Sequence, residues 1–180
     1  MKAGATSGRR RSLLFLARFL LLLVTCYFAV AWRPVNDAVI VPFTAGVARA
    51  AAALLGLLGE PVSVAGTVIR SSRFSVEIEN GCNGIETALL FGSAVLAFPA
   101  PWRRRAVGLV LGFAAIQLIN LIRVVTLFWI GAHRPVFFNS SHTVLWQSVV
   151  VLCGVALFLL WVSWEQKARA AADRGAPERR

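Results

Sequence analysis

Long apolar runs separated by short polar segments dominate the chain. Residues 13–32, 84–101, 106–131 and 143–164 are each long enough to cross roughly 30 Å of hydrocarbon as helices. Residues 38–59 are also apolar but contain Pro42 and Arg49, so length alone leaves open whether this segment spans the membrane. The pattern predicts an all-α polytopic membrane protein in which residues 1–180 form a single membrane domain.

Residues 62–80 follow a different pattern. From Phe74 to Glu79, apolar and polar residues alternate, which is typical of a β-strand with one buried face. We expect a short β-hairpin outside the bilayer, with its turn near residues 70–73.

Basic residues determine the expected topology. The net charge is +11, and most of the 19 basic residues flank the apolar runs. No interleaved aromatic motif accompanies them, which argues against nucleic acid as a partner. Cytoplasmic loops are enriched in Lys and Arg. This bias places the tails 1–12 and 165–180 and the triplet Arg103–Arg105 inside. The chain then has four spans, with residues 38–59 forming an outer interfacial helix.

Two further features concern the ends of the spans. Tryptophans at both expected surfaces, 32, 129 and 146 outside and 102, 161 and 164 inside, form aromatic belts. The sequence Ala29-Val30-Ala31 resembles a signal-peptidase site. The preceding run is long for a signal peptide, so an uncleaved anchor is favoured.

Arg123 lies deep within an apolar run, where an ionisable residue is a functional hypothesis by default. With this topology, Cys82, Arg123 and His142 all approach the outer surface. A thiolate is favoured at a helix N-terminus or beside a cation. Arg123 can stabilise an oxyanion, and His142 can accept and return a proton. The three residues predict cysteine-based acyl transfer. The cysteine spacings show no metal-ligand pattern, and we expect no metal or cofactor.

Other polar residues have weaker claims to the site. Asn120 shares a helix face with Arg123 and is expected to orient its guanidinium. Asn83 and Glu86 have the spacing of a capping box, a structural role, while a structural alternative pairs Glu86 with Arg123. His133 is the alternative to His142 as the candidate catalytic histidine. Three further residues complete the candidate lining of the site: Gly84, Ser141 and Gln147.

Three segments carry a resemblance to a known family. Residues 76–86, Val-Glu-Ile-Glu-Asn-Gly-Cys-Asn-Gly-Ile-Glu, resemble the cysteine motif of the exosortase/archaeosortase family. Residues 120–124 resemble its arginine motif, and Ser141-His142 its histidine motif. The resemblance covers roughly residues 45–150. The short chain looks most like the compact exosortase H type, although Val144-Leu145-Trp146 stands where the family often has a glycine.

The resemblance implies a protease or transpeptidase that cleaves C-terminal sorting signals of exported proteins. Each such signal consists of a short motif, a transmembrane helix and a basic tail. Cys82 would be the nucleophile of a thioacyl intermediate, with Arg123 and His142 completing the catalytic site. The location implied is the bacterial cytoplasmic (inner) membrane, with the site on the periplasmic side. The substrate helix and membrane lipid are the expected partners, and the acceptor stays open. The alternative is a non-enzymatic transporter or assembly subunit that uses Arg123 to bind an anion or a partner helix.

Overall fold

The computed structural model describes residues 2–138 and 145–175 and consists mainly of helices. In chain order, the elements are α1 (Lys2–Ala31), α2 (Arg33–Val35), the π-helical η1 (Asn36–Ile40), α3 (Val41–Leu57), β1 (Ser63–Ala65), β2 (Val68–Arg70), β3 (Ser75–Glu77), α4 (Ile85–Ala97), α5 (Trp102–His133), the 3₁₀ helix η2 (Pro135–Phe137) and α7 (Gln147–Gly175).

The structure confirms the polytopic helical fold class, but the set of long helices differs from the one expected. By length and composition, four helical segments could cross a membrane: Gly8–Ala31, Arg33–Leu57, Trp102–His133 and Gln147–Ala172. The apolar run 84–101 forms only the 13-residue α4, which is about 20 Å long. Pro99 and Pro101 end this helix early, because the residue before a proline is driven out of the helical region.

Both expected cytoplasmic tails are largely helical. Helix α1 starts at Lys2, so it includes most of residues 1–12. Helix α7 continues past residue 164 to Gly175, into the segment expected to be a cytoplasmic tail. Both helices therefore extend beyond the apolar runs from which they were predicted.

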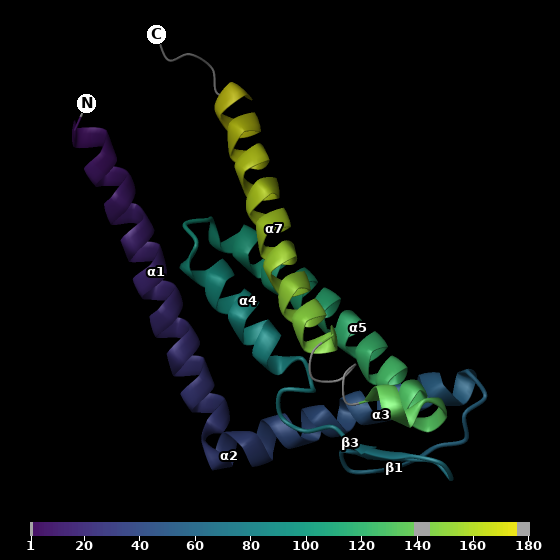
Figure 1. Cartoon of the computed structure of the whole chain (residues 1–180). Helices are drawn as coiled ribbons and strands as arrows, with labels where there is room; N and C mark the ends of the chain where they lie inside the picture. The colour runs from purple at the N-terminus through teal and green to yellow at the C-terminus, as the bar shows by residue number, and fades with distance from the viewer. Residues whose placement is uncertain (1, 139–144, 176–180) are drawn as a thin grey trace.

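The helices form a bundle with a transverse element at one end. Helix α4 packs against α1, α5 and α7. Helix α3 runs across the end of the bundle opposite the chain termini, with the sheet beside it (Figure 1). This arrangement resembles that of the expected outer interfacial helix, although α3 together with α2 and η1 is also long enough to span.

The expected hairpin is a three-stranded antiparallel sheet in the order β1-β2-β3. The turn near residues 70–73 is present, and a second turn at Gly66, with φ of 61°, adds β1. Central Ile69 pairs with both Val64 and Val76. The face they share packs against α3 and α5 in an apolar core, so the sheet is fixed to the same end of the bundle.

A second apolar core lies between α4, α5 and α7. It contains Phe91, Val95, Ile116 and Trp161. The two cores divide the molecule into a sheet end and an end near the α4–α5 turn. Each end also holds a buried charged residue, Arg123 at the first and Glu165 at the second.

Candidate functional site

Cys82 lies in a tight turn between β3 and α4 that depends on glycines. Gly81 and Gly84 flank this residue with φ values of 88° and 80°, in the left-handed region that favours glycine. A Cβ atom at Gly84 would also lie 3.1 Å from Cβ of Asn120 on α5. Gly84 therefore supports the site through its backbone conformation and by letting the turn approach α5 closely.

Asparagines hold this turn against the transverse segment. The amide nitrogen of buried Asn83 donates to the Thr44 hydroxyl at 2.9 Å, and its oxygen accepts from the Ile85 backbone N–H at 3.0 Å. Nearby, the Asn80 amide donates to the Asn36 side-chain oxygen at 2.9 Å. Residues 36–57 thus act as a platform for the cysteine turn, a contact between segments about 40 residues apart.

Arg123 reaches this turn from α5 and is 2% exposed. Its Nη2 donates to Cys82 Sγ at 3.6 Å and to Gln147 Oε1 at 3.3 Å. Its Nε is buried without a hydrogen-bond partner. Within residues 2–138 and 145–175, no carboxylate forms an ion pair with Arg123, so the alternative pairing with Glu86 is wrong. The guanidinium is a buried cation facing a thiol.

The local environment raises the pKa of the Cys82 thiol above its ordinary value, contrary to the expectation of a favoured thiolate. Burial is the largest cause, and Glu79 and Glu86 add to it. The charge and hydrogen bond of Arg123 lower the pKa but do not outweigh burial. A raised pKa disfavours the thiolate, so a base that takes the thiol proton would assist the sulfur as a nucleophile.

Asn120 and Glu86 do not have the roles expected of them. Asn120 is completely buried under Gly84, and neither its amide oxygen nor its nitrogen forms a hydrogen bond with any described residue, so it does not hydrogen-bond to Arg123. Gln147 contacts the guanidinium instead. Gly84, not Asn83, is the N-cap of α4. The Asn83 amide oxygen accepts from the Ile85 N–H and not from that of Glu86, so the expected capping box does not form among the described residues. The Glu86 carboxylate lies over Gly81.

Of the two histidines, only His133 lies within the described residues. His142 and Ser141 lie outside the described residues. His133 places Nε2 3.0 Å from Glu60 Oε1 and Nδ1 3.0 Å from the Trp129 carbonyl oxygen, and its ring stacks on Trp129. Both of its ring nitrogens are thus engaged with structural partners at the end of α5.

Apolar helices joined by a short sheet, with a buried arginine against a cysteine turn, define a multi-pass membrane protein with a thiol–guanidinium site. The family model for transmembrane exosortases (Exosortase_EpsH) matches residues 3–162. The chain therefore belongs to the transmembrane exosortase family, as its motifs indicated. Its assignment to the compact exosortase H type stays a prediction. No curated protein and no solved structure matches the chain.

Proposed function

We propose that the chain is a cysteine transpeptidase or protease that cleaves C-terminal sorting signals of exported proteins. The site would lie at the outer face of the bacterial cytoplasmic membrane. The observation that carries the proposal is the 3.6 Å contact between buried Arg123 Nη2 and Cys82 Sγ. Burying a cation that has no ion-pair partner among the described residues costs several kcal/mol, so a guanidinium aimed at a thiol has a chemical explanation more readily than a structural one. Family membership supports the same reading.

The residues suit a two-step acyl transfer. His142 would take the thiol proton and so assist a sulfur whose raised pKa disfavours the thiolate. The sulfur would then attack the scissile carbonyl carbon, and Arg123 would stabilise first the thiolate and then the oxyanion. When the C–N bond breaks, the proton would pass to the leaving amine. Water or an acceptor amine would resolve the thioacyl intermediate at Cys82.

The topology we propose places α1, α4, α5 and α7 across the bilayer and α3 along its outer surface. The basic residues near both termini and in the α4–α5 turn then lie on the cytoplasmic side, as the charge bias favours. Because α4 is only about 20 Å long, its Cys82 end would be recessed below the outer surface. A substrate anchored by its own helix could present its scissile bond at that depth.

The direct test is mass spectrometry of exported proteins in the host carrying Cys82→Ala. Loss of the nucleophile should cause exported proteins that retain an uncleaved C-terminal helix and basic tail to accumulate. Cys26→Ala, in α1, is the matched control and should leave processing unchanged. If the Cys82→Ala strain processes these proteins normally while producing the protein at a normal level, the proposal fails and the transporter or assembly role is favoured.

A further inference from the structure

An apolar groove of about 400 Å³ runs along α5 and α7, away from the cysteine turn. Gly108 and Gly112 line it together with Phe91 and Trp161, which pack so closely on the two glycines that a Cβ atom at either would collide with them. Side chains at the rim are left uncovered: Leu111 is 65% exposed and Trp164 is 47% exposed. The groove is thus open, and the side chains of the helix bundle do not fill it.

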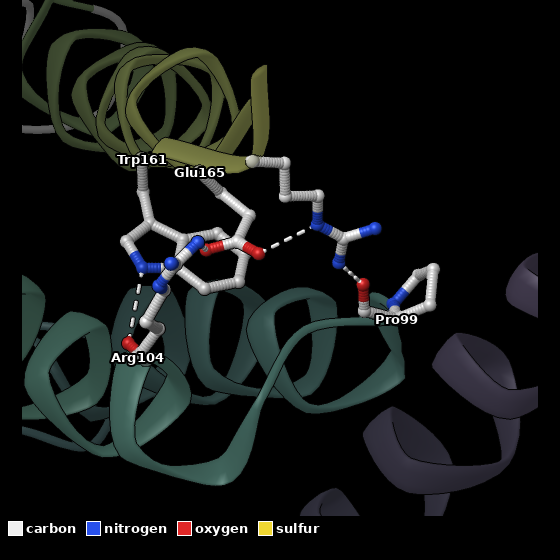
Figure 2. Close-up of polar contacts among 5 residues, drawn as sticks. Pro99, Arg104, Trp161 and Glu165 are labelled. Atoms are coloured by element: carbon white, nitrogen blue, oxygen red, sulfur yellow. Dashed lines mark hydrogen bonds and ion pairs between the residues drawn. The ribbon is translucent and has the colours of Figure 1, made fainter. Parts of the chain in front are cut away.

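The groove leads to a cationic cluster at one end. Arg104 lies one turn before Gly108 on α5, and Glu165 one turn after Trp161 on α7. Arg104 Nη1 lies 3.1 Å from Glu165 Oε2, and Arg169 Nε lies 2.7 Å from Glu165 Oε1. The Trp161 indole also donates to the Arg104 carbonyl oxygen at 3.3 Å (Figure 2). The cluster ties the ends of the two helices together.

This cluster carries excess positive charge that faces outward. One carboxylate is shared by two guanidinium groups, which leaves a net charge of +1. Glu165 is 0% exposed, whereas the Arg104 and Arg169 side chains are 30% and 46% exposed. A guanidinium has five N–H donors, so both arginines keep donors that can reach an anion at the surface.

We propose that this groove is a binding site for an anionic phospholipid. An acyl chain lies along Gly108 and Gly112, and the headgroup phosphate is bound by Arg104 and Arg169. Tryptophan beside a basic cluster is typical of the depth where hydrocarbon meets headgroups, and basic pockets between helices bind anionic headgroups. The site is at the opposite end of the bundle from Cys82, and its test does not depend on processing.

The charge disfavours two other occupants. A helix ending in a basic tail would bring more positive charge to the end of the groove beside Arg104 and Arg169, which is already positive. A second copy inserted in the same orientation would place two such positively charged clusters side by side, where they would repel each other. A lipid phosphate instead supplies the missing negative charge.

The test measures quenching of tryptophan fluorescence in the full-length protein reconstituted in phosphatidylcholine. Brominated phosphatidylglycerol or brominated phosphatidylcholine is titrated in, and the signal of Trp164 is obtained by subtracting that of Trp164→Phe. We expect the anionic lipid to quench at lower mole fraction, with a preference of about fivefold or more. Arg169→Gln should lower that preference about fivefold, as expected for one cation near a headgroup, and Arg169→Lys should retain most of it.

Arg33→Gln is the matched control, because it removes one exposed cation from α2, which lies at the end of the bundle opposite the chain termini (Figure 1). Equal quenching by the two lipids in the parent protein, or equal effects of Arg33→Gln and Arg169→Gln, would overturn the proposal. Displacement of the brominated lipid by a synthetic apolar helix with a lysine tail would assign the groove to a helix instead. Loss of quenching on raising the protein-to-lipid ratio would assign the groove to a second copy.

Discussion

Arg123 and Glu165 are buried at opposite ends of the bundle, and the two ends neutralise the buried charge differently. Glu165 is held between two arginines, and both of its carboxylate oxygens have cationic partners. Among the described residues, Arg123 has a thiol and a neutral amide as partners and one buried nitrogen with none. A buried charge with matched partners is explained by structure. A buried charge without such partners destabilises the fold, so its presence needs a reason other than stability.

The largest expected difference between the two ends is in catalysis. Arg123→Lys should lower substrate processing by about 10²–10³-fold, because an ammonium on a shorter stem lacks the planar, five-donor guanidinium that could contact the Cys82 sulfur and an oxyanion together. Glu165→Gln should change processing by only a few-fold. Quantitative immunoblotting of uncleaved exported protein, normalised to the amount of membrane-inserted variant, compares the two. Equal losses in the two variants would remove the distinction between the ends.

Loss of thermodynamic stability should be larger at the Glu165 end than at the Arg123 end, the reverse of the order expected for processing. The double variant Arg104→Met/Arg169→Met leaves Glu165 buried without a cation, and it should lose about 3–5 kcal/mol. Thermal unfolding of the detergent-solubilised protein measures the effect. A double variant as stable as the parent would mean that the cluster is not a structural ion pair.

Replacing Arg123 by an apolar residue sharpens the same contrast. Arg123→Met removes a buried charge that has no ion-pair partner within residues 2–138 and 145–175, while keeping a long side chain. The same thermal unfolding assay should show it to be neutral or stabilised by about 1–2 kcal/mol. Its processing activity should still be lost. A strongly destabilised Arg123→Met would instead indicate that the guanidinium supports the fold.

The smallest expected effect concerns the charges around the thiol. Glu79 raises the pKa of Cys82, so Glu79→Gln should lower that pKa and increase the thiolate fraction. Alkylation of Cys82 at pH 7.5 should become about twofold faster, since the thiolate is the reactive form. Glu77→Gln is the control, because the Glu77 carboxylate contacts Thr67 and does not act on the thiol. Slower alkylation in Glu79→Gln would contradict the electrostatic account of this turn.

Local patterns predicted much of this molecule. Hydrophobic run length predicted the helical bundle, strict alternation predicted β3 and its turn, and a charge in an apolar run identified Arg123. The expected topology and the family motifs both identified Cys82, and the structure brings Cys82 and Arg123 together. His142 lies outside the described residues, so its place in the site stays a prediction.

Features that depend on packing could not be predicted in this way. The contacts of Asn83 with Thr44 and of Arg104 with Glu165 join segments 39 and 61 residues apart, and helix periodicity carries no information about such pairs. The direction of the Cys82 pKa shift was hidden for a related reason, because the helix end and the cation were visible in sequence but the burial of Cys82, which raises the pKa, was not. The short α4 was predictable in principle, since Pro99 and Pro101 stand within its apolar run.

The pH dependence of Cys82 alkylation tests the central claim most directly. The measurement uses the full-length protein with Cys26 and Cys153 replaced by alanine, with and without Arg123→Gln. Because Arg123 lowers the pKa of Cys82, its loss should move the midpoint of the alkylation profile to higher pH and slow the reaction at pH 7.5. An unchanged midpoint would show that the guanidinium does not act on the sulfur, and the proposed reaction centre would be wrong.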